Sequence, residues 1–508
     1  MLAALALAWF AVLWVRPLYK ADESRYAEIS REMAASGDWI TPRLNGFKYF
    51  EKPPLQYWTT AAAFQVLGTQ DWTARLWTAL TGFAGIALVV AAGNRLFAPP
   101  AGAFAAAVLA ASPLYVLLGQ YNTLDMGLTF FLSAAIFAFA LGQMRLFWAA
   151  CALAVLSKGL IGIVLPLATI ALYALVKRDF EVIKRLRIVP GGLLFLVIAA
   201  PWFIAVSLAN DEFARFFFIR EHFERFTTQV HQRGQPAWYF LPVLVLGMGP
   251  LLLPVLCGWT RALRRRFEPQ LFLAIWALVV LAFFSASGSK LPSYILPAFP
   301  ALAVLAGGWL ASANARPTLL AQSALVVAAA AGIVLWASRA PDYGPWVAAA
   351  GVCLGSAALA GAVLAARARA GAALVAIALG SFAATQLAIV GHATQASRFS
   401  VASTLAAMPE PPGRNARVFA VHAYDHTMPW LMRRTVTMVG GKDELEHSIA
   451  WEPDKFLPDM AAFARAWQSA PEAYAFLDAT QFDARRAESG VPMQLVARGP
   501  RYVLVKKP

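Results

Sequence analysis

Two acids, an arginine and a tyrosine directly follow the first long apolar run of this chain. They are Asp22, Glu23, Arg25 and Tyr26. Carboxylates cost free energy at membrane depth unless water or a partner holds them at the interface. A carboxylate held there can move a proton or face a developing positive centre. We therefore expect Asp22 to take part in chemistry at a bilayer surface.

The residues from Asp22 to about Gly37 follow a helical pattern with one apolar face. Such an amphipathic helix would lie along the membrane surface. The helix dipole favours a carboxylate in the first turn, so capping is the plain structural alternative for Asp22. The adjacent Arg25 and Tyr26 favour a functional role instead.

The same loop holds a second cluster, Glu51 and Lys52 followed by Pro53 and Pro54. The prolines fix the backbone and are typical of a helix start, so they would hold Glu51 and Lys52 in a set direction. The aromatic residues around this cluster are ordinarily an interfacial anchoring belt.

Further polar residues fall at the predicted outer ends of later apolar runs or in a second outer loop. Snorkelling is the alternative for the lysine of this set, and a solvated charge run is the alternative for the loop residues. Arginine and lysine suit a phosphate, as a bidentate fork and a point charge respectively. A phosphate site in a cavity at the outer face, open to lipid, would suit a polyprenyl-phosphate substrate. The residues are Asp125, Lys158, His222, Arg225 and Tyr294.

The composition is that of an integral membrane protein. Of the 508 residues, 59% are hydrophobic and only 14% are charged, whereas soluble domains average about half apolar and a quarter charged. The net charge of +15 does not indicate nucleic acid, because the basic residues cluster in short gaps between apolar runs. Cys151, Cys257 and Cys353 lie inside apolar runs and are expected to be buried, with no disulfide or metal role.

About thirteen apolar runs are candidate membrane spans. The first lacks a basic start and a small-residue cleavage site, so we expect a retained helix rather than a signal peptide. The fifth is short and would form a broken pair with the sixth. The runs are 1–16, 72–96, 100–119, 123–143, 146–157, 159–176, 189–209, 237–260, 269–286, 292–312, 318–337, 345–366 and 371–391.

The positive-inside rule sets the orientation. With the N-terminus in the cytoplasm, both large basic clusters, 177–187 and 261–266, fall inside, and an odd number of spans places the C-terminus outside. Three segments then face outward and are too long for simple turns. They are 17–71, 210–236 and the tail from about 395 to 508.

The tail changes character after the loop-like junction 408–413. A helix is expected at about 456–467, and Asp425 with His426 reads more simply as a surface turn than as a polar site. We predict a transmembrane domain, 1–394, and a small α/β domain, 395–508, on an otherwise all-α polytopic membrane protein with outer amphipathic helices. The expected strands are 417–424, 434–439, 473–477 and 502–506.

Four stretches carry a family resemblance: 22–29, 37–46, 49–58 and 290–297. They resemble membrane glycosyltransferases of the GT-C fold that take a sugar from a polyprenyl phosphate. The strongest likeness is to bacterial aminoarabinose transferases that modify lipid A. The resemblance extends to the layout of about thirteen spans and an outer C-terminal domain.

Position by position, the resemblance implies catalytic roles for Asp22, Glu51 and Asp125. Arg220 stands where a histidine is expected, so His222 would take over that position. The resemblance also implies substrate-binding roles for Arg25, Tyr26, Lys52, Lys158, His222, Arg225 and Tyr294.

The resulting hypothesis is an inverting transfer of sugar, 4-amino-4-deoxy-L-arabinose in the family, from undecaprenyl phosphate to lipid A at the periplasmic face of a bacterial inner membrane. Lysines and arginines would stabilise the phosphate leaving group. Asp22 would orient or deprotonate the acceptor, position the amino sugar, or stabilise an oxocarbenium-like centre. We expect a monomer with no required cofactor, although Asp22, Glu51 and His222 could converge on a divalent cation.

Two other readings remain open. The same fold could use another sugar, or a protein or envelope-glycan acceptor. A lipid-linked sugar transporter would place ionisable residues near the bilayer midplane and show inverted repeats, and neither pattern is evident in the sequence. A purely structural role would not explain acids at four outer sites.

Overall fold

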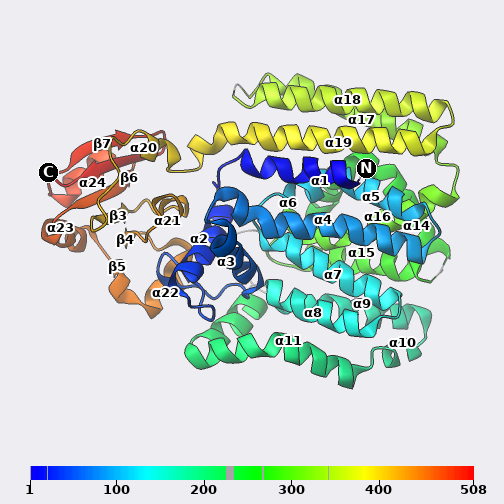
Figure 1. Ribbon diagram of the computed structural model, residues 1–508, viewed down its shortest axis with the longest axis horizontal. Helices are drawn as coiled ribbons and strands as arrows, with labels where there is room; N and C mark the ends of the chain where they lie inside the picture. Colours follow the sequence, from blue (N-terminus) through cyan, green and yellow to red (C-terminus); the bar gives the residue numbers. More distant parts are fainter. Residues whose placement is uncertain (1, 20, 225–233, 266–267, 341) are drawn as a thin grey trace. The chain divides into compact units, whose positions relative to one another are not determined.

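The computed structural model describes residues 2–19, 21–224, 234–265, 268–340 and 342–508 (Figure 1). The chain packs as two compact units. The helical unit comprises Met1–Val15, Glu51–Gln56 and Arg75–Gly391, and the mixed unit comprises Arg16–Phe50, Tyr57–Ala74 and His392–Pro508.

The helical unit is built mainly from apolar helices, and it contains most of α4 and nearly all of α19. They are α1 (Leu2–Ala11), α4 (Asp71–Leu96), α5 (Ala101–Ala110), α6 (Pro113–Leu118), α7 (Leu124–Ala140), α8 (Met144–Lys158), α9 (Ile161–Lys177), α10 (Glu181–Lys184), α11 (Ile188–Ala209), α13 (Phe240–Met248), α14 (Leu252–Arg265), α15 (Gln270–Ala286), α16 (Phe299–Ser312), α17 (Arg316–Ala337), α18 (Gly344–Ala366) and α19 (Ala370–His392).

Within the described residues, seven helices or helical runs are long and apolar enough to cross a membrane, and shorter apolar helices lie among them. The prediction of a polytopic, mainly α-helical membrane protein is confirmed, whereas the count of thirteen spans stays a prediction. The seven are Asp71–Leu96, Ile188–Ala209, Ala237–Arg264, Pro292–Ser312, Arg316–Ala337, Gly344–Ala366 and Ala370–Arg398.

Trp9 joins the first helix to the rest of the helical unit. Its indole Nε1 donates to the carbonyl of Ala79 in α4 at 3.0 Å, and its ring stacks on Phe382 of α19 with centroids 6.2 Å apart. A buried tryptophan contributes a large apolar area and needs one hydrogen-bond acceptor, and both needs are met here. The chain entering the first outer loop therefore starts from a fixed position in this unit.

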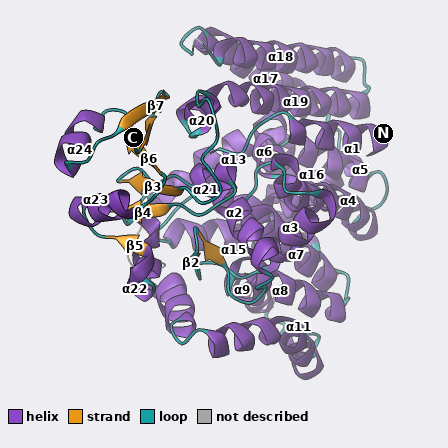
Figure 2. Cartoon of the chain, turned by 60° about the vertical axis from the view of Figure 1, so that its left-hand side comes forward, coloured by secondary structure: helices purple, strands orange, loops and turns teal. Residues whose placement is uncertain are grey.

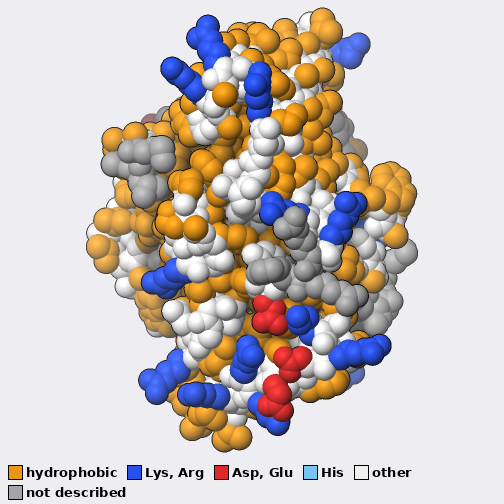
Figure 3. All heavy atoms as spheres, turned by 90° about the vertical axis from the view of Figure 1, so that its right-hand side faces the viewer, with side chains coloured by type: hydrophobic (Ala, Val, Ile, Leu, Met, Phe, Trp, Pro, Cys, Tyr) orange, Lys and Arg blue, Asp and Glu red, His pale blue; other side chains and the backbone are white. Residues whose placement is uncertain are grey.

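The short loops at one end of the helical unit carry exposed basic side chains. Figure 3 shows this end, where Lys and Arg side chains are far more frequent than Asp and Glu. This distribution is what the positive-inside rule requires of a cytoplasmic face. The exposed residues of the predicted inner loops include Arg95, Arg145, Arg178, Lys184, Arg185, Arg187, Arg264, Arg316, Arg367 and Arg369.

The mixed unit contains a six-stranded sheet in the tail, in the order β5-β4-β3-β6-β8-β7 (Figure 2). Strands β3 to β6 pair in parallel, and β8 runs antiparallel to both β6 and β7. The strands are β3 (Arg417–Val421), β4 (Thr437–Val439), β5 (Phe456–Leu457), β6 (Ala473–Asp478), β7 (Gln494–Arg498) and β8 (Tyr502–Lys506).

Alternate residues of the central strands fill two separate cores, as the period of two requires. Phe419 and Leu477 pack on one face with Trp467 of the helix α23, whereas Val418 and Phe476 pack on the other. The predicted small α/β domain is thereby confirmed. The helices of the tail are α20 (Ala402–Ala406), α21 (Thr427–Met432), α22 (Glu446–Trp451), α23 (Met460–Ser469) and α24 (Phe482–Ser489).

Two sequence predictions in the tail differ from the structure. The helix expected at 456–467 begins only at Met460, because Asp459 caps it by accepting from the Ala462 amide at 2.7 Å. Residues Phe456–Leu457 form strand β5 instead. His426 is not in a surface turn, because it is buried, with 5% of its surface exposed.

The first outer loop also belongs to the mixed unit. It forms α2 (Ala21–Ser36), the hairpin β1–β2 (Arg43–Leu44 and Phe47–Lys48) and most of α3 (Leu55–Leu67). Helix α2 matches the predicted helix within one residue at each end. Its expected polar face, with Arg25, Glu28 and Glu32, does not face water, because Arg25 and Glu28 are buried and Glu32 is half-buried.

Trp430 of α21 anchors the tail to this loop. It is fully buried in a cluster with Leu18, Ala27, Phe64 and Ala74. Its indole donates to Asp71 Oδ1 at 2.9 Å, and Asp71 Oδ2 accepts from the Leu18 amide at 3.2 Å. One carboxylate therefore fixes a backbone segment and an aromatic side chain together.

We expect Trp430→Ala to destabilise the mixed unit by about 3–5 kcal/mol, the usual cost of removing a buried tryptophan. The apparent melting temperature of the purified protein measures the change. Trp238→Ala is the control, because that side chain is 63% exposed. Equal melting temperatures for the two variants would contradict this account of the packing.

Candidate functional site

The predicted site residues fall into two sets, one in each unit. Asp22, Arg25 and Tyr26 belong to the mixed unit. Arg225 and the side chain of His222 lie outside the described residues. The helical unit holds Glu51, Lys52, Asp125, Lys158 and Tyr294.

Asp125, Lys158 and Tyr294 come together in the helical unit. Lys158 Nζ donates to Asp125 Oδ1 at 2.5 Å and lies 4.9 Å from the centre of the Tyr294 ring. Asp125 is in the first turn of α7 and Lys158 is the last residue of α8, so each charge also suits the dipole of its own helix. Lys158 is therefore an ordered ion-pair and cation–π partner, not a side chain reaching for water.

Lys52 is the second held cation of this unit. With 8% of its surface exposed, it donates to the Glu51 backbone carbonyl at 2.7 Å and to Glu221 Oε2 at 3.3 Å. The Glu51 carboxylate lies 3.9 Å from the same ammonium. Glu221 was not predicted as a site residue, because a glutamate within the charged run at 220–225 gives no signal that it lies beside Lys52.

A buried amide pair holds the Lys52 segment in the helical unit. Gln56 Nε2 donates to Asn122 Oδ1 at 2.7 Å, and both side chains are buried. Asn122 lies three residues before Asp125 in the sequence. The stretch Glu51–Gln56 and the loop that leads into α7 are thus connected by a direct hydrogen bond.

In the mixed unit, Arg25 is the centre of a charged cluster. Its guanidinium donates to Asp22 Oδ1 through Nη2 and to Glu444 Oε2 through Nη1. His426 Nε2 lies on the other oxygen of Glu444. The Arg25 side chain is 6% exposed and the Asp22 side chain is 42% exposed, so the base of the cluster is buried and Asp22 is open.

Tyr26 packs beside this cluster. Its ring lies 5.1 Å from the Arg25 guanidinium carbon and 6.1 Å, centroid to centroid, from the Tyr57 ring. The Arg25 guanidinium is therefore held by two carboxylates and by the ring of Tyr26. Tyr26 supports Arg25 directly.

One turn further along α2, three charged residues share a buried region. Arg31 donates to both oxygens of Glu28, at 2.7 and 2.6 Å. Glu32 accepts from the Gly46 amide at 2.9 Å. Burial, with the Glu28 charge adding to it, raises the pKa of Glu32 to about 8.

In the described part of the chain, no group of three or more His, Cys, Asp or Glu side chains could hold a metal ion. The suggested ligands Asp22 and Glu51 belong to different units, and the His222 side chain is outside the described residues.

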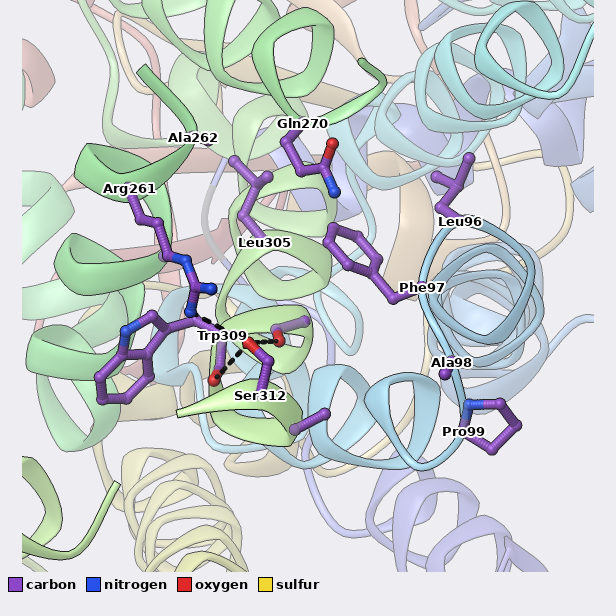
Figure 4. A pocket seen from close by; sticks show the side chains of 13 residues that line it. Leu96, Phe97, Ala98, Pro99, Arg261, Ala262, Gln270, Leu305, Trp309 and Ser312 are labelled. Carbon is purple, nitrogen blue, oxygen red and sulfur yellow. Dashed lines mark hydrogen bonds between the residues drawn. The ribbon is translucent and has the colours of Figure 1, made fainter. Parts of the chain in front are cut away.

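A cavity of about 360 Å³ in the helical unit is lined by none of the predicted site residues. It lies where α4 ends, against α14 and α16 (Figure 4). Its cation, Arg261, donates to Ser312 Oγ at 3.0 Å, and most of the remaining lining is apolar. This cavity gives no support to a catalytic role.

Two family profiles match the chain. Residues 406–507 match the family described as aminoarabinose transferase C-terminal domain, and residues 2–215 match the family described as dolichyl-phosphate-mannose-protein mannosyltransferase.

Similar curated proteins include the undecaprenyl phosphate-alpha-4-amino-4-deoxy-L-arabinose arabinosyl transferases of Aeromonas hydrophila and Aeromonas salmonicida. They are 36% and 37% identical over 308 and 310 residues. Each match covers 57% of this chain and 55% of the relative, so the chain spans little more than half the length of the curated relatives it matches.

Two solved structures match nearly the whole chain. ArnT from Cupriavidus metallidurans bound to undecaprenyl phosphate is 36% identical, with a TM-score of 0.94, and the match covers 99% of this chain and 97% of that one. The same protein in the apo state gives 35% identity and a TM-score of 0.92 over the same shares.

The raised pKa of Glu32 makes the stability of the mixed unit depend on pH. The folded protein holds a proton between the ordinary value of 4.5 and about 8, where the unfolded chain has lost it. Stability from this group is therefore complete below the lower value and is lost as pH rises through the higher one. We expect the apparent melting temperature to fall between pH 6 and pH 9, and to fall less for Glu32→Gln.

Glu446→Gln is the control for this measurement, because it removes an exposed carboxylate of the same unit. It should keep the pH dependence of the unmodified protein. If Glu32→Gln also keeps that full dependence, Glu32 is not the titrating group.

Proposed function

The chain belongs to the aminoarabinose transferase family of membrane glycosyltransferases, as its motifs predicted, and we propose that it transfers 4-amino-4-deoxy-L-arabinose from undecaprenyl phosphate to lipid A with inversion. The observation that carries the proposal is the near-complete structural match to a relative solved with undecaprenyl phosphate. The held cations in the helical unit and the open carboxylate in the mixed unit supply the chemistry that such a reaction needs.

The phosphate leaving group gains negative charge as the glycosidic bond breaks. Lys52 and Lys158 are already ordered by carboxylates, so little reorganisation is needed when a phosphate arrives. We propose that the phosphate becomes a partner of Lys52 and takes over from Glu221, which holds the ammonium in place until the phosphate arrives. Arg225 is proposed as a further phosphate ligand from its sequence position.

Asp22 is proposed to act on the acceptor side of the reaction. A lipid A phosphate is already largely ionised, so a strong base is unnecessary, and Asp22 can position the amino sugar or stabilise the oxocarbenium-like centre. Its partly exposed side chain and its hydrogen bond from Arg25 suit a carboxylate that is accessible and held in one direction. Asp125 is proposed to hold the Lys158 ammonium in position, as Glu221 holds that of Lys52.

We place the enzyme in a bacterial inner membrane with its N-terminus in the cytoplasm and its C-terminal domain in the periplasm. The exposed basic side chains at the inner-loop positions support this orientation. The sugar would then be transferred at the outer leaflet.

One alternative has an observation of its own. The N-terminal part of the chain also matches mannosyltransferases that act on protein, which favours a protein acceptor in place of lipid A. Mass spectrometry of products formed with each acceptor, from one lipid-linked donor, separates the two functions.

Asp22→Asn should lower the rate of transfer by at least about 10²-fold, because the variant keeps the side-chain shape and loses the charge. Mass spectrometry of lipid A, after incubation with purified protein and the polyprenyl-phosphate donor, measures the product. Asp483→Asn, an exposed aspartate of the same unit, should keep the full rate. Full activity in Asp22→Asn would remove Asp22 from the mechanism.

A further inference from the structure

Three consecutive side-chain contacts connect the tail to Asp22 inside the mixed unit. His426 Nε2 lies against Glu444 Oε1, Arg25 Nη1 donates to Glu444 Oε2, and Arg25 Nη2 donates to Asp22 Oδ1. The two arginine–carboxylate hydrogen bonds are charge-assisted, a class that is shorter and stronger than hydrogen bonds between neutral groups.

One end of the cluster is buried and the other end is exposed. His426 and Arg25 have side chains that are each 6% exposed, Glu444 is 24% exposed and Asp22 is 42% exposed. The ring of Tyr424 meets His426 edge-on, with centroids 5.2 Å apart and ring planes at 87°. The imidazole therefore has a fixed plane, and each later member of the chain is oriented by the one before it.

Charge balance gives Glu444 a second effect. The carboxylates of Asp22 and Glu444 both face the Arg25 guanidinium, so Arg25 is shared between two anions and does not serve Asp22 alone. The second carboxylate leaves Asp22 able to attract a positive centre while Arg25 still holds it in place.

We infer that Glu444 and His426 are positioning residues for sugar transfer, acting through Arg25 to hold Asp22 in place. The inference rests on the proposed function, in which Asp22 faces the reacting sugar or the acceptor. It gives the C-terminal domain a part in the reaction, although neither residue need touch a substrate.

The first test compares Glu444→Gln with Glu452→Gln in the full-length purified enzyme. Both are acids of the tail that bind an arginine of the first loop, because Glu452 accepts from Arg43 Nη1 at 3.0 Å. Glu444→Gln should lower kcat about tenfold or more, with KM for the lipid-linked donor changed less than about threefold, since misplacing a reacting group costs rate more than binding. Glu452→Gln should stay within about twofold of the unmodified kcat.

Two further variants separate positioning from packing. His426→Gln keeps a nitrogen donor near the place of Nε2 and should retain most of the rate, whereas His426→Phe fills the space without a donor and should not. Glu444→Gln should add no further loss to Arg25→Lys, because both changes break the same connection. Fully additive losses, or equal rates for the two His426 variants, would overturn the inference.

A cryo-EM structure of Glu444→Gln gives a readout that needs no activity. The side chains of Arg25 and Asp22 should both be displaced from their positions in the unmodified protein. Unmoved side chains, or an unmodified kcat, would overturn the positioning role. Displaced side chains in an enzyme that transfers no sugar even when unmodified would support the positioning and overturn the proposed function alone.

Discussion

A cation buried in protein or at a membrane surface must have an anion beside it, and this constraint shapes every part of the candidate site. An unpaired buried charge costs several kcal/mol, so removing one partner of a buried pair destabilises by about 3–5 kcal/mol. Lys52 has Glu221, Lys158 has Asp125, and Arg25 has both Asp22 and Glu444. Each ion pair therefore requires that the helices and loops carrying its two residues lie side by side.

The same constraint explains how such pairs can serve a reaction. An ammonium that is already charged, desolvated and fixed needs little rearrangement to bind a phosphate, which can take over part of the role of the resident carboxylate. In the proposed mechanism, the carboxylates keep the site stable when it is empty and give way to a more highly charged anion. On this account the pairs are both structural and functional.

The sequence predicted those features that local signals determine. The apolar runs, the bounds of α2, and the candidates Asp22, Lys52 and Asp125 all follow from short stretches of chain. The strands β3, β4, β6 and β8 were also predicted, because each contains consecutive apolar residues. Strands β5 and β7 were missed, because β5 has two residues and β7 has a largely exposed pattern.

The missed site residues depend on contacts that no local pattern encodes. Glu444 meets Arg25 across 419 positions of sequence, and Glu221 meets Lys52 across 169. His426 follows an aspartate in a turn-like stretch, and only the packing of α2 against α21 explains its burial.

The central claim is that Glu221 holds Lys52 in place for a phosphate and competes with that phosphate for the ammonium. The most direct test is the affinity of undecaprenyl phosphate for the purified protein, measured by native mass spectrometry with Lys52→Met and Glu221→Gln. We expect Lys52→Met to bind at least about tenfold more weakly, since one charge-assisted contact is lost, and Glu221→Gln to bind as tightly or more tightly. Unchanged affinity in Lys52→Met, or a Glu221→Gln variant that binds as weakly as Lys52→Met, would contradict the claim.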